Sequence, residues 1–330
     1  MRNIWMIAAT LGAISLMSFS SPETIADTFP SKPVKLVAPF PPGGGVDLTA
    51  RLLSTKLRET FGQTVIVENI VGATGQIGVE SVAKARPDGY AAVVAASAAI
   101  TINVHLTKLG YDPIKDLAPI TMLVSSPTAL AVNASLPVDN LEQFIAYLKK
   151  NPGKVSYSTS GIGSQLHVAG ELLKQRTGVQ MTAVAYKGTL PATAAIVSGE
   201  VQAGISDLPS LLPHAAAGRV KILAITDATR SRAAPHIPTV SEAGVPNFVA
   251  GSWLGLFTTG GTPPEVVEKW HSAATTLLQS PEMRNSLQGI GLEAAPSKSA
   301  NEFREFVSGE VKKWGEAIQA ANIRLDQPGN

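Results

Sequence analysis

The apolar residues of this chain follow two different periods. Leu141, Phe144, Ile145 and Leu148 recur at the spacing of one helix face, with charged and amide side chains on the other face. The run at residues 34–39 is instead short and largely apolar, as expected of a buried strand. Runs of these two kinds alternate through most of the chain. The pattern predicts an α/β fold in which helices cover both faces of mostly parallel sheets.

The predicted strands are bounded by glycine, proline or polar turns, at residues 34–39, 64–68, 91–95, 154–159, 181–186, 203–206 and 219–226. The predicted helices occupy residues 48–59, 77–85, 141–151, 165–178, 191–198, 211–217, 264–279, 281–290 and 300–322. No glycine- or serine-rich linker interrupts this order. A two-lobed chain of this kind must cross between its lobes on ordered strands, which we expect near residues 120–132 and 251–258.

Residues 1–26 have the order of a secretory signal peptide. Arg2 precedes an apolar stretch at residues 4–19, and Thr24-Ile25-Ala26 offers a small-x-small cleavage site. An uncleaved membrane anchor is the alternative, but the stretch is short and is followed by a cleavable region. We therefore expect the segment to be removed, which leaves a periplasmic protein.

Composition narrows the possible functions. Without Arg2 and Glu23 the formal net charge is still +2, so the exported chain has no basic excess for nucleic acid or a membrane surface. The chain has no cysteine, which excludes disulfides, thiol catalysis and thiolate metal sites. Its length and its 45% hydrophobic residues suffice for two cores without such cross-links.

Four turns rich in glycine or hydroxyl groups each follow a predicted strand and precede a predicted helix. In open α/β sheets such turns gather at the carboxyl ends of the strands, where ligands bind. The first turn contains Gly43, Gly44 and Gly45, which allow close backbone approach, and the helix start behind them favours an anion. Asp47, the expected helix cap, partly cancels that field. A purely structural tight turn is the alternative.

The other turns carry weaker signals. The second, at residues 69–78, spaces its glycines as GxxGxxG, which is not the dinucleotide-binding pattern. The third places hydroxyl groups around a helix start, at Ser158, Thr159, Ser160 and Ser164. In the fourth, Lys187 is either a carboxylate partner or a solvated turn residue. Asp207, at a strand end, either binds ligand through water, recognises a cationic group or caps the next helix.

The sequence gives little support for catalysis. Five histidines are scattered without a metal-binding spacing, and no phosphate-binding lysine follows a glycine loop. Ser164 and His167 share one helix face, an arrangement that seldom allows nucleophilic attack. We expect His167 to orient the serine-rich turn, and we expect no catalytic residue, no metal and no cofactor.

These motifs resemble one known family along nearly the whole exported chain, from about residue 30 to residue 325. The matching pieces include KLVAPFPPGGGVDLTAR, VIVENIVGATGQIGVESVAKARPDGY, YDPIKDLAPIT, NPGKVSYSTSGIGSQLHVAGELL, AYKGTLPA, GRVKILAITDATRS, IPTVSEAGVPNF and GSWLGLF. In this order they are similar to the Bug-type substrate-binding proteins of tripartite tricarboxylate transporters. No single piece is diagnostic, but their succession is specific.

The resemblance implies a two-lobed type II periplasmic binding protein that closes on a small carboxylate, held by backbone amides, hydroxyls and ordered waters. It implies a first lobe at residues 27–128 and 253–330 and a second lobe at residues 129–252, with the ligand cleft between them. Carried over to this chain, the ligand-binding residues are Phe40, Gly43, Gly44, Gly45, Asp47, Gly72, Ala73, Thr74, Gly75, Ser158, Thr159, Ser160, Gly161, Ser164, His167, Tyr186, Lys187, Gly188, Thr189 and Asp207.

The chain departs from the family pattern at several of these turns. Ile70-Val71 replaces a common Arg-Pro pair, Ala185 replaces a common proline, and Gly45-Val46 stands where a polar residue is frequent. The expected pocket is therefore more apolar and less cationic than is usual, which leaves an aromatic or longer aliphatic carboxylate as open as a di- or tricarboxylate.

The resulting hypothesis is a monomeric periplasmic solute-binding protein that delivers a carboxylate to membrane transporter subunits. Two alternatives remain from the sequence. One is a sensor whose closed form docks on a membrane signalling receptor, and the other is a periplasmic hydrolase that depends on Ser164 or His167.

Overall fold

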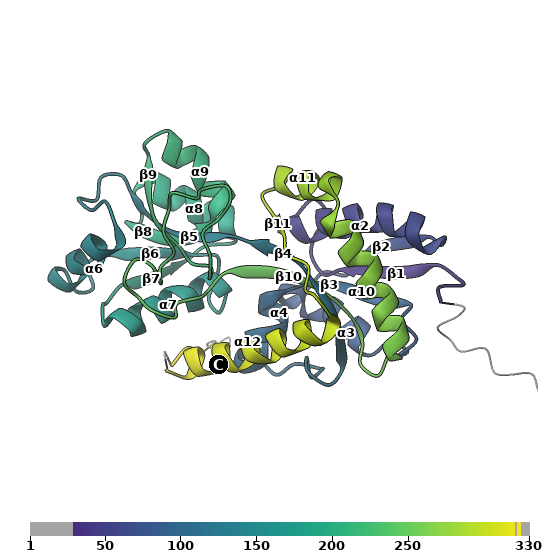
Figure 1. Ribbon diagram of the computed structural model, residues 1–330. Helices are drawn as coiled ribbons and strands as arrows, with labels where there is room; N and C mark the ends of the chain where they lie inside the picture. Colours follow the sequence, from purple (N-terminus) through teal and green to yellow (C-terminus); the bar gives the residue numbers. More distant parts are fainter. Residues whose placement is uncertain (1–28, 321, 325–330) are drawn as a thin grey trace, which may run out of the picture.

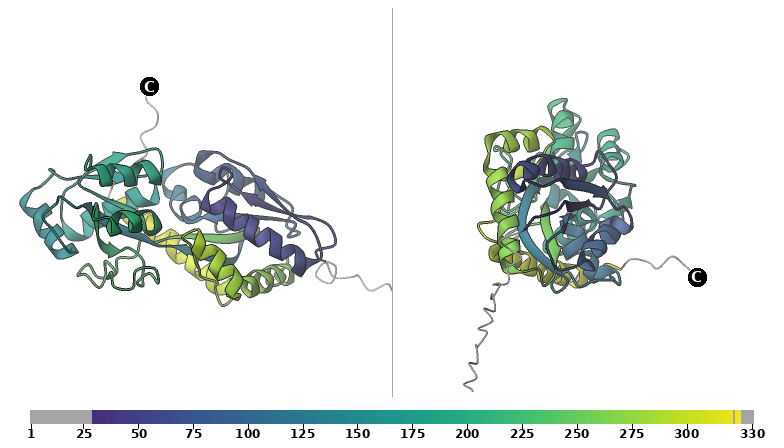
Figure 2. Two further views of the ribbon diagram at one scale, coloured as in Figure 1. Left: turned by 90° about the horizontal axis from the view of Figure 1, so that it is seen from above. Right: turned by 90° about the vertical axis from the view of Figure 1, so that its right-hand side faces the viewer.

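Two α/β lobes lie end to end in the computed structural model, which describes residues 29–320 and 322–324 (Figure 1). Seen from above, they form an elongated molecule with one lobe following the other (Figure 2). The predicted signal peptide, residues 1–26, lies outside the described residues. We call the lobe with the six-stranded sheet lobe 1 and the lobe with the five-stranded sheet lobe 2.

Lobe 1 is built on the strand order β11-β4-β10-β3-β1-β2. Its strands are β1 (Val34–Ala38), β2 (Val65–Asn69), β3 (Ala91–Ala96), β4 (Leu117–Ser126), β10 (Ser252–Thr259) and β11 (Glu293–Ala294). Its helices are α2 (Gly45–Phe61), the 3₁₀ turn η1 (Ala73–Gly75), α3 (Gln76–Ala83), α4 (Ser97–Thr101), α5 (Asn103–Leu106), α10 (Pro264–Gln279), α11 (Pro281–Gly289) and α12 (Ala300–Ala320).

Lobe 2 has the strand order β7-β6-β8-β5-β9. Its strands are β5 (Thr128–Asn133), β6 (Ser156–Thr159), β7 (Thr182–Ala185), β8 (Ala203–Asp207) and β9 (Val220–Ile225). Its helices are α6 (Leu141–Lys150), α7 (Gln165–Thr177), α8 (Thr189–Ser198) and α9 (Leu208–Ala216).

The chain crosses between the lobes at the two places that the sequence indicates. Pro127 alone separates β4 of lobe 1 from β5 of lobe 2, and residues 226–251 lead from β9 back into β10. The expectation of mostly parallel sheets is wrong in detail, because both sheets are mixed. In lobe 1, β10 runs antiparallel to both its neighbours, and in lobe 2, β5 does the same. A chain that leaves a lobe and returns must traverse the sheets in opposite directions, which parallel sheets built from βαβ units do not provide.

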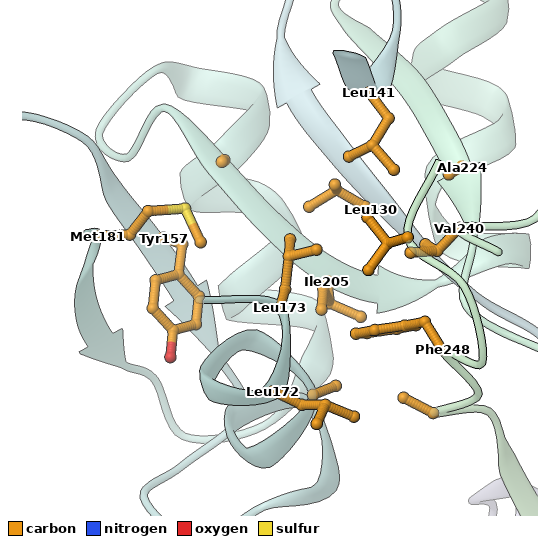
Figure 3. Packing of buried hydrophobic residues seen from close by; sticks show 14 of the residues in the cluster. Leu130, Leu141, Tyr157, Leu172, Leu173, Met181, Ile205, Ala224, Val240 and Phe248 are labelled. Carbon is orange, nitrogen blue, oxygen red and sulfur yellow. The ribbon is translucent and has the colours of Figure 1, made fainter. Parts of the chain in front are cut away.

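The core of lobe 2 confirms the predicted helix at residues 141–151. Leu141, Phe144 and Leu148 are fully buried, and Asn140 caps the helix by accepting a hydrogen bond from the Gln143 amide at 2.9 Å. Figure 3 shows the same core around Phe248, which lies among side chains of α7 and of the sheet. Each such side chain stabilises the fold by about 1.5–3 kcal/mol when it leaves water.

Helix α12 ties the two lobes together. Phe303 and Val307 belong to an apolar cluster of lobe 1, whereas Trp314 and Ile318 belong to the core of lobe 2. The Trp314 indole donates a hydrogen bond to Glu310 at 3.0 Å, so its polar edge is satisfied although the side chain is fully buried. Figure 1 shows this helix, in yellow, running beneath both lobes. Helix α12 therefore packs on both lobes and connects them in addition to the crossing strands.

Candidate functional site

Strand register places the glycine- and hydroxyl-rich turns on two edges that face each other. β1, β2 and β3 run in the same direction as β4, so all four carboxyl ends lie at the edge where β4 leaves lobe 1. In lobe 2, Thr128 at the start of β5 pairs with Asp207 at the end of β8, and β6 and β7 run parallel to β8. The turns after β1 and β2 and the turns after β6, β7 and β8 thus lie at the edges of the two lobes that β4 and β5 connect. Open α/β sheets bind ligands at such edges.

In lobe 1 the first turn is held by the Asp47 carboxylate. Its Oδ2 accepts hydrogen bonds from the Gly43 amide at 2.9 Å and from the Arg51 Nε at 3.0 Å. Its Oδ1 accepts from the Asn69 amide group at 2.8 Å and lies 2.9 Å from an Arg51 terminal nitrogen. A carboxylate offers about four lone-pair positions, and these four donors fill them. Asp47 therefore positions the turn and has no acceptor left for a ligand.

The charges around Asp47 compensate each other. The Arg51 hydrogen bond holds the pKa of the Asp47 carboxyl down at about 2, against the opposing effect of burial. The expectation that Asp47 caps α2 is wrong in detail: the cap residue is Gly44, and Asp47 stands inside the first turn and reaches back to the Gly43 amide. A side chain in the third helical position can bond backward in this way without occupying the cap. The α2 start itself receives no side-chain cap.

The second turn of lobe 1 has a strained backbone and packs against the first turn. Ala73 and Thr74, which are not glycines, have positive φ angles of 45° and 55° between Gly72 and Gly75, which also have positive φ. Non-glycine residues in this region cost free energy and tend to persist at functional sites. A Cβ at Gly75 would lie 3.0 Å from the Phe40 ring, and the Asn69 amide donates to the Phe40 carbonyl at 3.0 Å. Phe40 thus joins the two turns.

In lobe 2 the third turn is held by neutral groups. The Ser164 hydroxyl caps α7 by accepting a hydrogen bond from the His167 amide at 3.2 Å. The His167 Nδ1 in turn accepts from the Gly163 amide at 3.1 Å, so the ring proton of the neutral form resides on Nε2. Burial lowers the pKa of His167, which favours the neutral ring that this bond requires. His167 orients the turn, as expected.

The remaining predicted residues of lobe 2 lie at the same edge but differ in what they offer. The Tyr186 hydroxyl is engaged by Glu200 at 2.8 Å, and the Ser158 hydroxyl is buried against Gly204. Lys187 is exposed and forms no ion pair within the described residues. Gly188 begins α8 with a φ of 109° and no side-chain cap. Of these residues, Lys187 and the amides after Gly188 are the groups left open to a ligand.

Asp207 begins α9 from the end of β8. Burial raises the pKa of its carboxyl, and the nearby Thr189 side chain opposes that shift. Next to Asp207 lies a cluster of hydroxyl groups. The Thr193 and Ser206 hydroxyl oxygens are 2.5 Å apart, and the Ser210 hydroxyl donates to the Asp207 carbonyl at 2.7 Å. This cluster is not apparent from the sequence, because its members are spread along α8, β8 and α9.

A polar contact between the lobes was also missed. The Ser97 hydroxyl at the start of α4 donates to the Gln165 side chain at the start of α7, at 2.6 Å, and Gln165 donates to the Ala250 carbonyl at 3.1 Å. Both side chains are buried. The Gln165 position follows the serine-rich turn, but nothing in the sequence indicates that Ser97, 68 residues earlier, is its partner.

The chain belongs to a known family: the model of the tripartite tricarboxylate transporter family receptor matches residues 49–323. Protein BugT of Bordetella pertussis is 32% identical to it over 325 residues, which cover 98% of this chain and 99% of BugT. The resemblance stated from the motifs is thereby confirmed. Members of this family are periplasmic solute-binding receptors and not enzymes.

Solved structures show the same fold. A protein of R. palustris solved with adipate is 34% identical, with a TM-score of 0.76 over 90% of this chain and 99% of its own. MatC from Rhodopseudomonas palustris, solved with bound malate, is 31% identical, with a TM-score of 0.72 over 88% of this chain and 100% of its own. A solute-binding protein from Polaromonas reaches a TM-score of 0.79 at 28% identity, over 88% of this chain and 99% of its own. The two-lobed binding-protein fold is confirmed.

Among the described residues, no helix combines the length and the apolar character needed to cross a bilayer. Within the same residues, no three histidine or carboxylate side chains converge in a way that suits a metal ion.

Proposed function

We propose that this chain is an exported receptor that captures a small carboxylate between its lobes and passes it to the membrane subunits of a tripartite tricarboxylate-type transporter. The observation that carries the proposal is the set of helix starts at the facing edges. Helices α2, α3, α8 and α9 begin there without a side-chain cap, whereas α7, which begins at the same edge of lobe 2, is capped by Ser164. Uncapped helix starts present free amide donors and favour an anion.

The amides of both lobes would hold the acid together. A carboxylate has enough acceptor positions to bridge the turn after Gly43 and the turns after Gly161 and Gly188. Closing the lobes removes water from these charge-assisted hydrogen bonds and strengthens them. The ligand therefore shifts the population toward the closed form, and the closed form is what the membrane subunits would recognise. Backbone donors supply the positive potential without a buried arginine.

Asp207 is a carboxyl group at this edge that would oppose an anion. Burial already favours its protonated form, and a bound carboxylate would raise its pKa further. In the protonated form it is a hydrogen-bond donor that a second acid group of the ligand could use. We infer that ligand affinity increases as the pH falls through the pKa of Asp207, and that Asp207→Asn removes this dependence. A titration that shows the same pH dependence in both proteins would contradict this role.

The localisation follows from the first residues and from the family. We propose that residues 1–26 direct export and are removed, which leaves a monomer in the periplasm. Mass spectrometry of the protein from a periplasmic fraction gives the cleavage site, and a mass that still includes these residues would contradict the proposal.

Thermal unfolding tests the function. The refolded protein, freed of carried-over ligand, is melted with adipate, malate, citrate and benzoate, and with adipamide as the uncharged match of adipate. A ligand at 100 times its Kd stabilises the folded state by about 2.7 kcal/mol, which raises the melting temperature by several degrees. At least one acid should produce this rise and adipamide should not. A flat response to every acid would contradict the proposal.

Uptake measurements separate transport from sensing. In cells that already express the membrane subunits, deletion of this protein should abolish uptake of the acid found in the melting screen. Uptake that persists in these pre-induced cells would favour the sensor instead.

A further inference from the structure

Large apolar side chains are exposed at few places in the described chain, and most of them stand on turns that follow the carboxyl ends of strands. Seven such side chains are exposed, and four of these lie on the turns at the facing edges. The four are Val71 at 50% exposure, Ile77 at 49%, Ile162 at 51% and Leu190 at 75%. None of them is among the residues predicted to bind the ligand. Apolar side chains gathered at a cleft indicate an interaction, whereas scattered ones need no explanation.

The two residues of lobe 1 form a single apolar surface. Val71 follows β2, and Ile77 lies in the first turn of α3. A Cβ at Gly72 would lie 2.4 Å from the Ile77 Cδ1, so the Ile77 side chain lies across the bare backbone of Gly72, next to Val71. The strained turn at Ala73 and Thr74 is thus flanked by two exposed apolar side chains.

The two residues of lobe 2 are presented by neighbouring turns. Ile162 stands between Gly161 and Gly163, whose φ angles are 132° and 75°, and the Gly163 amide is anchored on His167. Leu190 lies in the first turn of α8, directly after the uncapped start at Gly188. A Cβ at Gly161 would lie 3.9 Å from the Tyr186 carbonyl, so the turns after β6 and β7 are in contact. Both apolar side chains therefore accompany the amides that we assign to the carboxylate.

Positive charge at these turns is sparse. Arg51 is compensated by Asp47, and Asp207 adds a carboxyl group of its own. Lys187 is an exposed cation of these turns without an ion pair in the described residues. Such a surface suits an acid that carries one or two carboxylates on an apolar body, and it offers little to a compact ligand with three carboxylates.

We propose that Val71, Ile77, Ile162 and Leu190 form an apolar rim that selects acids in which the carboxylate is joined to an apolar body, an aliphatic chain or an aromatic ring. This inference rests on the proposed function and names its substrate class. On closure the rim residues of the two lobes approach each other around the body of the ligand and leave water together. A methylene that leaves water contributes about 0.8 kcal/mol, which corresponds to an affinity gain of about four-fold.

Calorimetric titration of the refolded exported chain tests the rim. The ligands are succinate, adipate, suberate, benzoate and citrate. We expect the affinity to rise by about four-fold for each added methylene from succinate to adipate, and citrate to bind at least ten-fold more weakly than adipate. A series in which succinate or citrate binds more tightly than both suberate and benzoate would overturn the inference.

Two variants locate the effect. Leu190→Ser and Ile162→Ser should each weaken adipate by about five- to ten-fold while changing succinate by less than two-fold, because the shorter acid has less apolar surface to cover. Ile114→Ser is the matched control, since Ile114 is 45% exposed on lobe 1 away from these turns, and it should alter no affinity. Unchanged melting temperatures without ligand establish that the variants fold.

The possible failures are distinguishable. If no acid binds the parent protein, the proposed function itself fails. If acids bind but the rim variants weaken all of them equally, the rim is not selective and the inference fails alone. If the variants bind every acid normally but abolish uptake in cells, the rim is a docking surface for the membrane subunits, and the inference is likewise overturned.

Discussion

The turn after β1 in lobe 1 and the turn after β6 in lobe 2 reach the same end by different chemistry. In lobe 1, the charged carboxylate of Asp47 accepts from four donors, among them Nε and one terminal nitrogen of the Arg51 guanidinium. In lobe 2, a neutral imidazole and a serine hydroxyl hold the turn. Neither turn keeps a free charged group. In both lobes, local side chains therefore hold the turn in place, while backbone amides remain available for the ligand.

Removal of the charged anchor should have the largest effect. Asp47→Ala leaves the Gly43 amide without its acceptor and the Asn69 amide group with the Phe40 carbonyl alone. We expect a loss of about 2–4 kcal/mol in the free energy of unfolding together with at least ten-fold weaker ligand binding. Denaturant unfolding and calorimetry measure the two losses. Asp139→Ala, which breaks the surface ion pair with Lys221, is the control and should cost about 0–1 kcal/mol. Equal effects of the two substitutions would show that Asp47 is an ordinary surface carboxylate.

Removal of the neutral anchor should cost less. His167→Ala leaves the Gly163 amide unpaired and opens a space beside α7, for which we expect about 1–3 kcal/mol. His236→Ala, at an exposed histidine, should be neutral within about 0.5 kcal/mol. Denaturant unfolding measures both. If His167→Ala leaves stability and affinity unchanged, the turn of lobe 2 does not depend on the imidazole.

The two anchors should fail at different pH values. The pKa of Asp47 is lowered from 3.8 to about 2, so its contribution is complete above pH 3.8 and is lost as the pH falls toward 2. The pKa of His167 is lowered from 6.5, so the unfolded state binds the proton first and stability already declines as the pH falls below 6.5. Amide hydrogen exchange, corrected for intrinsic rates, should show the Gly163 amide losing protection before the Gly43 amide. Simultaneous loss at both amides would contradict the comparison.

The smallest effect concerns the helix that joins the lobes. Gly309 lies in α12 between the side chains that pack on lobe 1 and those that pack on lobe 2. A methyl group there would meet no atom within 4 Å, so Gly309→Ala should raise the free energy of unfolding by about 0.5–1 kcal/mol through helix propensity alone. Gly170→Ala, where a Cβ would lie 2.3 Å from the Tyr157 ring, should destabilise instead. A destabilised Gly309→Ala protein would show that α12 bends at this position.

Helices and strands could be predicted from the sequence where the apolar residues followed one clear spacing. The helices at residues 141–151 and 264–279 were predicted within a residue of their observed ends. Helices α8 and α9 begin two and three residues earlier than predicted, because Pro191 and Pro209 are tolerated inside a first turn and do not have to start it. The strands β4, β5 and β10 were recognised only as crossing segments, since a fully buried antiparallel strand shows no alternation.

The turns that form the candidate site could be predicted from the sequence, but the contacts of their individual side chains could not. Glycines after a strand and before a helix indicate where a ligand approaches, and the family resemblance implies which turns act together. The partners of Asp47 could be foreseen only for Arg51, which is four residues away, because Asn69 comes to the carboxylate through the pairing of β1 with β2. Of the rim residues only Val71 was noted from the sequence, as a departure from the family pattern; Ile77, Ile162 and Leu190 could not be distinguished from core side chains until their exposure was known.

The proposal that the two lobes approach each other when an acid binds can be tested by measuring the distance between them. The sequence has no cysteine, so Glu59→Cys on α2 and Lys149→Cys on α6, both exposed, give one spin-labelled pair that spans the lobes. Pulsed electron paramagnetic resonance then measures the distance with and without a saturating acid. We predict a shift to a distinct distance population with the acid and none with its uncharged amide. An unchanged distribution at full occupancy would show that the acid is bound without any approach of the two lobes.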